Sequence, residues 1–401
     1  MEVSEKRLES VQFCLIVALV FFQQIATGMC SLTFIYHLRR VFALSAGLIG
    51  LAAGTASLVY VFACIFLSRF YKRFKLSNQV VFGSFGLALV IFFISMSDSL
   101  LLTWILIAIF GLFHSILWPS FDIWIARGKE GIQLSKALGI FNVSGGIGAS
   151  LAPFLCTLLV ERNTHLSFYV AACIVLFNGI LVVCLSLVIP SIGAIASEKN
   201  YIQMHQKVDH STPLRYLAWI GVFMTFLVSF SLQTTFPLFT KEVLHWSEST
   251  TGLILLLMGI SSCLTFMYLG KRTFWHFKLQ FIVCIQLALI LLLVSFRLVQ
   301  NVFLFMIFFI GIGFFAASAS LSSVFHGASG AQERSRRMNI HEVSLNLGIV
   351  LGGGLGGGLY QRVGFHQMLL WIALLLFFVL LGEVGIYLFK RKASCNRTVS
   401  S

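Results

Sequence analysis

The chain has 401 residues, of which 58% are hydrophobic and only 10% are charged, and its formal net charge is +14. Soluble domains carry about 25% charged residues, so this composition excludes an ordinary soluble protein and indicates an integral membrane protein. The excess of Lys and Arg requires no nucleic-acid partner, because basic cytoplasmic loops and anionic membrane lipid account for it.

Twelve apolar stretches are long enough to cross a membrane, because a spanning helix needs about 20 mostly apolar residues. In chain order, the sequence predicts spans at 11–35, 45–67, 78–97, 101–126, 137–160, 166–190, 216–238, 250–270, 278–297, 302–326, 338–361 and 367–389. A hydrophilic stretch separates the sixth span from the seventh. It divides the chain into an N-terminal half at 1–190, a central loop at 191–214 and a C-terminal half at 215–401. The predicted fold class is therefore an all-α membrane protein built from two six-helix bundles.

The two sides of this topology differ in charge. Most of the 28 Lys and Arg residues fall on the side that holds both termini and the central loop. Loops rich in Lys and Arg stay in the cytoplasm. We therefore expect a multi-pass protein of the cell (inner) membrane with both termini in the cytoplasm.

The second half repeats the first at an offset of 200 residues, without a gap. Small residues recur at every fourth position in both halves: Ser144, Gly148, Ala152 and Cys156, then Ser344, Gly348, Gly352 and Gly356. This spacing places them along one helix ridge, where two backbones can approach closely. We expect these ridges to lie where the two halves slide against each other. Two like halves in a membrane chain are typical of a transporter that holds its substrate between them.

Twelve spans, a six-plus-six repeat and cytoplasmic termini together resemble the major facilitator superfamily. A family motif between spans two and three contains a Gly, an Asp-Arg pair, a second Gly and further basic residues. Here Arg69, Lys72 and Arg73 match the motif, whereas Ser68 and Tyr71 replace its Asp and second Gly. The resemblance implies a secondary transporter that works by alternating access, driven by an ion gradient or by the gradient of the solute itself. The replaced Asp leaves the family's usual cytoplasmic latch without its acidic partner.

The resemblance also implies a cavity lined by spans one, four, seven and ten. Polar and aromatic residues of these spans are the candidate substrate-binding residues: Gln23, Gln24, Thr27, His114, Trp118, Ser229, Gln233 and Ser318. Amide, hydroxyl and aromatic groups suit a small neutral polar or amphipathic solute. The spans lack Lys and Arg at mid-depth, which argues against a strongly anionic solute. The alternative interpretation is structural, with hydroxyls bonded to their own helix and amides pairing neighbouring helices.

Few titratable residues lie within the spans, which makes each one informative. His114 lies at mid-depth and is the first candidate for proton coupling, because histidine titrates near neutral pH. Asp122 and Glu342 lie near the cytoplasmic ends of spans four and eleven. They either bind protons or form a latch with basic residues such as Arg69, and their interfacial position favours the latch. Glu383, in span twelve, has no assigned role.

The sequence predicts no enzymatic activity and no cofactor or metal. His341-Glu342 begins a zinc-protease pattern, but Leu345 stands where the second His would be, and no phosphate-binding loop is present. The nine cysteines are scattered singly, which indicates neither disulfides nor zinc. The expected partners are a small-molecule solute, membrane lipid and protons or sodium ions, without nucleic acid, and the expected oligomeric state is a monomer. A non-transporting receptor or scaffold and a membrane-embedded enzyme are the alternative functions.

Overall fold

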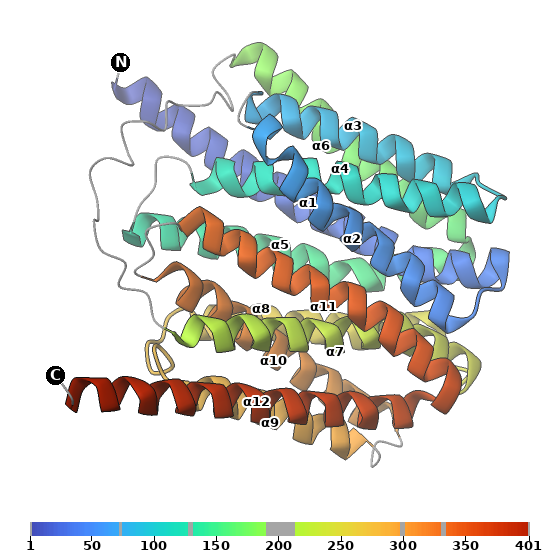
Figure 1. The fold of residues 1–401 in the computed structure, drawn as a ribbon. Coiled ribbons are helices and arrows are strands. Elements are labelled where there is room, and N and C mark those ends of the chain that lie inside the picture. Colours follow the sequence, from blue (N-terminus) through green and yellow to red (C-terminus); the bar gives the residue numbers. More distant parts are fainter. Residues whose placement is uncertain are drawn as a thin grey trace.

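The computed structural model describes residues 2–71, 74–126, 131–189, 213–296, 301–329 and 334–399. These ranges form twelve α-helices: α1 (Glu2–Phe42), α2 (Ala46–Tyr71), α3 (Leu76–Ser95), α4 (Leu100–Ala126), α5 (Gly131–Arg162), α6 (Thr164–Val188), α7 (Leu214–Glu242), α8 (Glu248–Leu269), α9 (Leu279–Ser295), α10 (Val302–Ala328), α11 (Arg334–Val363) and α12 (Phe365–Val399). The helices run roughly side by side, with α1–α6 forming one group and α7–α12 the other (Figure 1). The all-α class and the two groups of six helices confirm the predicted fold class.

Eleven of the described helices are long and apolar enough to cross a membrane. The remaining one, α9, has 17 residues, which corresponds to about 25 Å of helix. Side-chain caps fix several helix starts: Asn163, Ser247 and Asn301 each accept a hydrogen bond from a backbone N–H in the first turn of α6, α8 and α10. The predicted central loop at 191–214 falls outside the described residues except for positions 213 and 214.

Both chain termini lie at the same end of the bundle (Figure 1). We call this end the terminal end and the opposite one the far end. Helix α1 runs from the terminal end to the far end, and successive helices alternate in direction. The carboxyl ends of α1, α5 and α7 and the start of α8 therefore meet at the far end.

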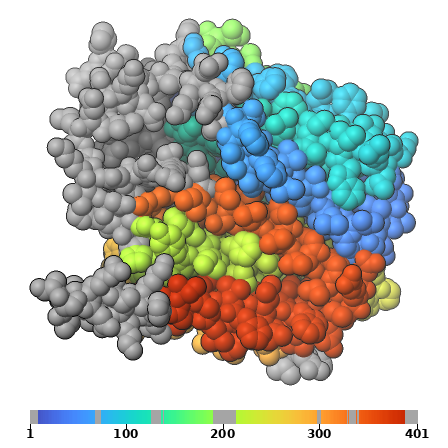
Figure 2. Space-filling model, in the orientation of Figure 1, coloured from blue at the N-terminus to red at the C-terminus, as the bar shows by residue number. Residues whose placement is uncertain are grey.

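The two halves repeat in their packing. Helix α5 packs against α1 in the first half, and α11 packs against α7 in the second. Between the halves, α2 packs against α11 and α5 packs against α8, and these pairs occupy equivalent places in the two repeats. Figure 1 shows α11 lying between α2 and α7, and the surface view shows α2 directly beside α11 (Figure 2). The halves therefore meet along two related helix pairs, which we call the two seams.

The seams are made by small residues. A Cβ atom at Gly50 in α2 would overlap the backbone carbonyl of Gly353 in α11. In the equivalent seam, a Cβ atom at Gly252 in α8 would lie 3.0 Å from the carbonyl oxygen of Pro153 in α5. Only a missing side chain permits these approaches, so the seams depend on glycine at these positions.

The small-residue ridges predicted to lie between the halves pack instead inside each half. A Cβ atom at Gly148 would overlap the backbone oxygen of Phe21 in α1, and one at Gly352 would overlap that of Leu227 in α7. Two further ridge residues also pack within their own half: Ser144 donates a hydrogen bond to the backbone oxygen of Val17 in α1 at 2.8 Å, and a Cβ atom at Gly348 would overlap the backbone oxygen of Phe223 in α7. The prediction of their location was wrong because α5 and α11 each have two closely packed faces. A spacing of four residues identifies a packed face but not the helix that it meets.

Candidate functional site

A ridge on α4 carries the titratable and aromatic candidates of the first half. His114, Trp118 and Asp122 follow one another at intervals of four residues, so their side chains leave the same face of the helix. The imidazole of His114 lies 6.1 Å from the indole of Trp118, and the Tyr60 ring of α2 lies 5.5 Å from His114. From α5, the Phe141 ring lies 5.9 Å from Trp118. The structure therefore brings two predicted site residues together within an aromatic cluster.

His114 is enclosed by rings. Its Nε2 atom is buried and has no hydrogen-bond partner among the described residues, and its neighbours include Tyr60, Phe110 and Trp118. These neighbours supply no negative charge that could balance an imidazolium. The role of His114 in proton coupling stays a prediction. Its ring-lined surroundings favour that role less than the interaction between Asp122 and Glu342 favours proton binding by those acids.

Asp122 and Glu342 belong to opposite halves, and their carboxyl groups interact electrostatically. Tyr60 interacts with both of them. Neither acid forms an ion pair within the described part of the chain, whose ion pairs all lie at the far end. Two interacting carboxylates repel each other when both are ionised, and a proton on either one removes the repulsion. The backbone of Arg69 lies in the last turns of α2, but its side chain falls outside the described residues, so the latch stays a prediction.

The amides of α1 take part in packing inside the first half. Gln23 is fully buried, and the Nδ2 atom of Asn178 in α6 donates to its Oε1 atom at 3.4 Å and to the carbonyl of Leu19 at 3.1 Å. Thr27 donates to the backbone carbonyl of Gln23 at 2.9 Å. Gln24 is half-buried and lies against glycines of α5. Gln23 and Thr27 therefore fit the structural interpretation better than substrate binding.

The candidates of the second half are distributed between core and partly exposed positions. Ser229 and Ser318 are buried, and their hydroxyl groups have no hydrogen-bond partner among the described residues. Gln233 is half-buried. Sequence reasoning assigned no role to the 2.8 Å contact between the Ser323 hydroxyl of α10 and the His341 ring of α11. The unpaired hydroxyls of Ser229 and Ser318 can accept hydrogen bonds from a bound solute.

Charged contacts join the two halves at the far end. Arg39 Nε lies 2.6 Å from Glu242, and Arg40 Nη2 lies 2.6 Å from Glu248, whose side chain is only 6% exposed. Lys241 Nζ adds a second contact to Glu248 at 2.8 Å. We call these five residues the far-end ion-pair network. It links α1 to α7 and α8, so the far end is closed in this structure.

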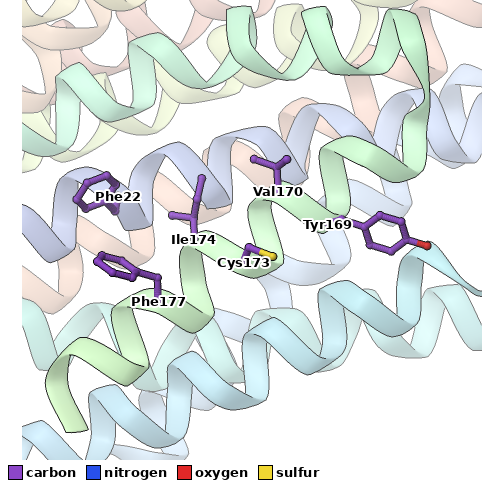
Figure 3. Close-up of a pocket in the computed structure, with 6 residues that line it drawn as sticks. All are labelled: Phe22, Tyr169, Val170, Cys173, Ile174 and Phe177. Carbon is purple, nitrogen blue, oxygen red and sulfur yellow. The ribbon is translucent and has the colours of Figure 1, made fainter. Parts of the chain in front are cut away.

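An apolar groove of about 340 Å³ lies elsewhere, on the outer surface between α1 and α6 (Figure 3). It is lined by Phe22, Tyr169, Val170, Cys173, Ile174 and Phe177. Phe177 is 52% exposed, as expected for a ring that faces lipid hydrocarbon. None of the candidate substrate-binding residues lines this groove, which lacks the polar groups that a hydrophilic solute requires.

Part of the chain is similar to curated bacterial transporters. It is 30% identical over 104 residues to a protein of Staphylococcus saprophyticus named "Proton-coupled antiporter flippase LtaA". It is also 28% identical over 124 residues to the protein of that name from Staphylococcus haemolyticus. The aligned segments cover 25% and 30% of this chain and 26% and 31% of those proteins. The chain therefore matches about a quarter to a third of each relative's length.

Solved transporter structures share the fold over nearly the whole chain. The nucleoside transporter NupG superposes with a TM-score of 0.70 at 13% identity, covering 94% of this chain and 99% of NupG. A POT family transporter superposes with a TM-score of 0.71 at 12% identity, covering 95% of this chain and 96% of the other. At these identities the similarity concerns the fold alone.

The family model described as "Major Facilitator Superfamily" matches residues 16–330 and 218–401. The two matches together reach from the first span to the end of the chain. They agree with the two repeated halves, the two seams and the superposed transporters. The chain therefore belongs to the major facilitator superfamily, a family of secondary membrane transporters and not of enzymes.

Proposed function

We propose that this protein exchanges protons for a small neutral polar or amphipathic solute by alternating access. The electrostatic interaction between the carboxyl groups of Asp122 in α4 and Glu342 in α11, one from each half, carries the proposal. Antiport is supported by the names of the partial relatives, which are described as proton-coupled antiporters. The solute is proposed to bind between the halves, near Trp118 and the unpaired hydroxyls of Ser229 and Ser318.

The proposed coupling follows from where the halves are joined. The far end is held by the far-end ion-pair network, whereas the described residues form no ion pair between the halves at the terminal end. Closing the terminal end brings α4 of one half toward α11 of the other. That motion costs electrostatic energy while Asp122 and Glu342 are both ionised, and protonation of one acid lowers the cost. Acidic pH therefore favours closure of the terminal end.

We place both termini in the cytoplasm of a cell (inner) membrane, because the basic loops lie at the terminal end. In that orientation the far end faces the outside, and the structure corresponds to a state closed toward the outside. Protonation then shifts the population toward a state open to the outside. Proton release on the cytoplasmic side reverses the shift and returns the protein to the state open to the cytoplasm.

Spin-label distance measurements on the reconstituted protein test this proposal without a known solute. One label pair replaces Val41 and Val243 at the far end, and another replaces Lys75 and Lys278 at the terminal end, all at exposed positions. Lowering the pH from about 8 to about 5 supplies the proton that relieves the repulsion between the two carboxylates. It is expected to shorten the terminal-end distance and lengthen the far-end distance.

The double variant Asp122→Asn with Glu342→Gln is expected to lose this pH response. Glu383→Gln is the matched control, since Glu383 is likewise a carboxyl group within a membrane span but lies in α12 beside Gln286 of α9, within one half. The control should keep the response. Distances that do not change with pH in the parent protein, or a response that persists in the double variant, would contradict coupling through this pair.

A further inference from the structure

A groove of about 440 Å³ lies on α8 at the terminal end and in the turn that follows it. Five residues line it: Leu264, Met267, Tyr268, Lys271 and Arg272. The other four residues follow Leu264 by three, four, seven and eight positions. This spacing places all five on one face of the helix and of the turn that continues it. Along this face the chemistry changes in order, from aliphatic to aromatic to cationic.

The order matches the depth of the groove in a membrane. The apolar span of α8 ends at Leu269, so the aliphatic residues lie within the hydrocarbon and the cations lie just beyond it. Leu264 is 59% exposed, Met267 45% and Tyr268 56%. Tyrosine at the boundary is typical of the interfacial aromatic belt. The groove therefore crosses from acyl-chain depth to headgroup depth.

The cationic end of the groove is held in place and is not neutralised. The backbone N–H of Lys271 donates to Tyr268 and that of Arg272 to Leu269, while the Trp275 indole donates to Leu269 at 3.0 Å. The Arg272 guanidinium lies 5.7 Å from the centre of the Tyr268 ring. Neither cation forms an ion pair within the described ranges. Two positive charges therefore face headgroup depth with free donors.

We propose that this groove binds one anionic phospholipid. Its phosphate contacts Lys271 and Arg272, and an acyl chain follows Leu264 and Met267. A soluble phosphate would leave the aliphatic part of the groove unused, whereas a lipid without net charge would leave the two cations uncompensated. Anionic headgroups are the partners that basic sites at the membrane surface recruit.

A lipid bound in this groove contacts a helix that takes part in the interface between the two halves. Helix α8 forms one of the two seams with α5 of the other half. A lipid that spans from Leu264 to Arg272 holds the last two turns of α8 against the bilayer surface. Occupancy of the groove therefore acts on a helix that moves when the halves rock, independently of which ion drives transport.

Native mass spectrometry of the full chain, purified in detergent with added lipid, tests the proposal. The probes are phosphatidylglycerol and, as the zwitterionic comparison, phosphatidylcholine with the same acyl chains. The parent protein is expected to retain one phosphatidylglycerol in preference to phosphatidylcholine. Lys271→Gln with Arg272→Gln is expected to weaken phosphatidylglycerol binding by roughly 5- to 25-fold, at about fivefold for each lost cation.

Lys278→Gln is the matched control, because Lys278 is an exposed cation of the same connection but does not line the groove. It should retain the lipid as the parent does. Leu264→Ser with Met267→Ser should also weaken binding, and glycerol 1-phosphate, which lacks acyl chains, should not bind. The proposal is overturned by equal retention of the two lipids, by undiminished binding in the Lys271 and Arg272 variant, by an equal loss in Lys278→Gln, or by tight binding of glycerol 1-phosphate.

Discussion

Replacement of Glu248 by Gln is expected to open the far end. This carboxylate accepts from Arg40 of the opposite half at 2.6 Å and from Lys241 of its own half at 2.8 Å. Of these two contacts of Glu248, the one with Arg40 joins the halves. A hydrogen bond between charged groups contributes about 1.5–3 kcal/mol when it is buried, and the 37% exposure of the Arg40 side chain reduces that contribution. We expect a loss of about 1–2 kcal/mol, which changes the ratio of closed to open far ends by roughly 5- to 30-fold.

The far-end label pair at Val41 and Val243 measures this ratio as the weights of the short and long distances. Glu242→Gln is the comparison, because the Glu242 side chain is 34% exposed whereas that of Glu248 is 6% exposed, so solvent and salt screen the Arg39–Glu242 pair more strongly. Its effect should stay below about 1 kcal/mol. High salt should reduce both effects, and the effect of Glu242→Gln should fall more steeply.

A double-mutant cycle with Arg40→Met separates the contact between the halves from other effects of the mutation. If the contact holds the far end closed, the two substitutions together should cost less than the sum of their separate effects. Distance distributions that stay within a factor of two of the parent in Glu248→Gln would refute the reasoning. Additive effects of the two substitutions would also refute it.

Three further predictions concern the interior of the bundle. Gly50→Ala should destabilise the protein by about 1–3 kcal/mol, because the added Cβ atom would overlap the carbonyl of Gly353. Thermal unfolding should show this loss. Gly382→Ala is the control and should not lower the unfolding midpoint, because open space surrounds the Cβ position at Gly382. His114→Gln should keep the pH-dependent change of the spin-label distances, and loss of that change would return the coupling role to His114. Asn178→Leu should cost about 1–3 kcal/mol in denaturant unfolding, since the buried Gln23 side chain in α1 loses the hydrogen bond that Asn178 donates to it. An unchanged midpoint would show that the pair contributes nothing.

Hydropathy predicted the number and order of the helices, because each span must satisfy its backbone hydrogen bonds within itself. The fourth helix was predicted at 101–126 and is observed at Leu100–Ala126. The first was predicted at 11–35 but extends over Glu2–Phe42. A helix that continues into the polar headgroup region has no hydropathy signal there, so its true ends were missed.

The candidate site was predictable only along single helices. The spacing of His114, Trp118 and Asp122 already places them on one face. The approach of Glu342 from the opposite half depends on tertiary packing, which a repeat pattern does not specify. The same reason explains why the contact between Arg40 and Glu248 was not foreseen, since its partners lie 208 positions apart.

The two seams determine how the halves can move. Because the seams are related by the internal repeat, the axis of any rocking motion must pass between them, and both seams must bear the same tilt. Gly50 lies near the far end of α2, and 17 further residues of the helix follow it up to Leu67. That length is a lever arm of about 26 Å, so a tilt of roughly 15° displaces the terminal end by about 7 Å. A small rotation at the glycines is thereby amplified into a passage wide enough for a solute.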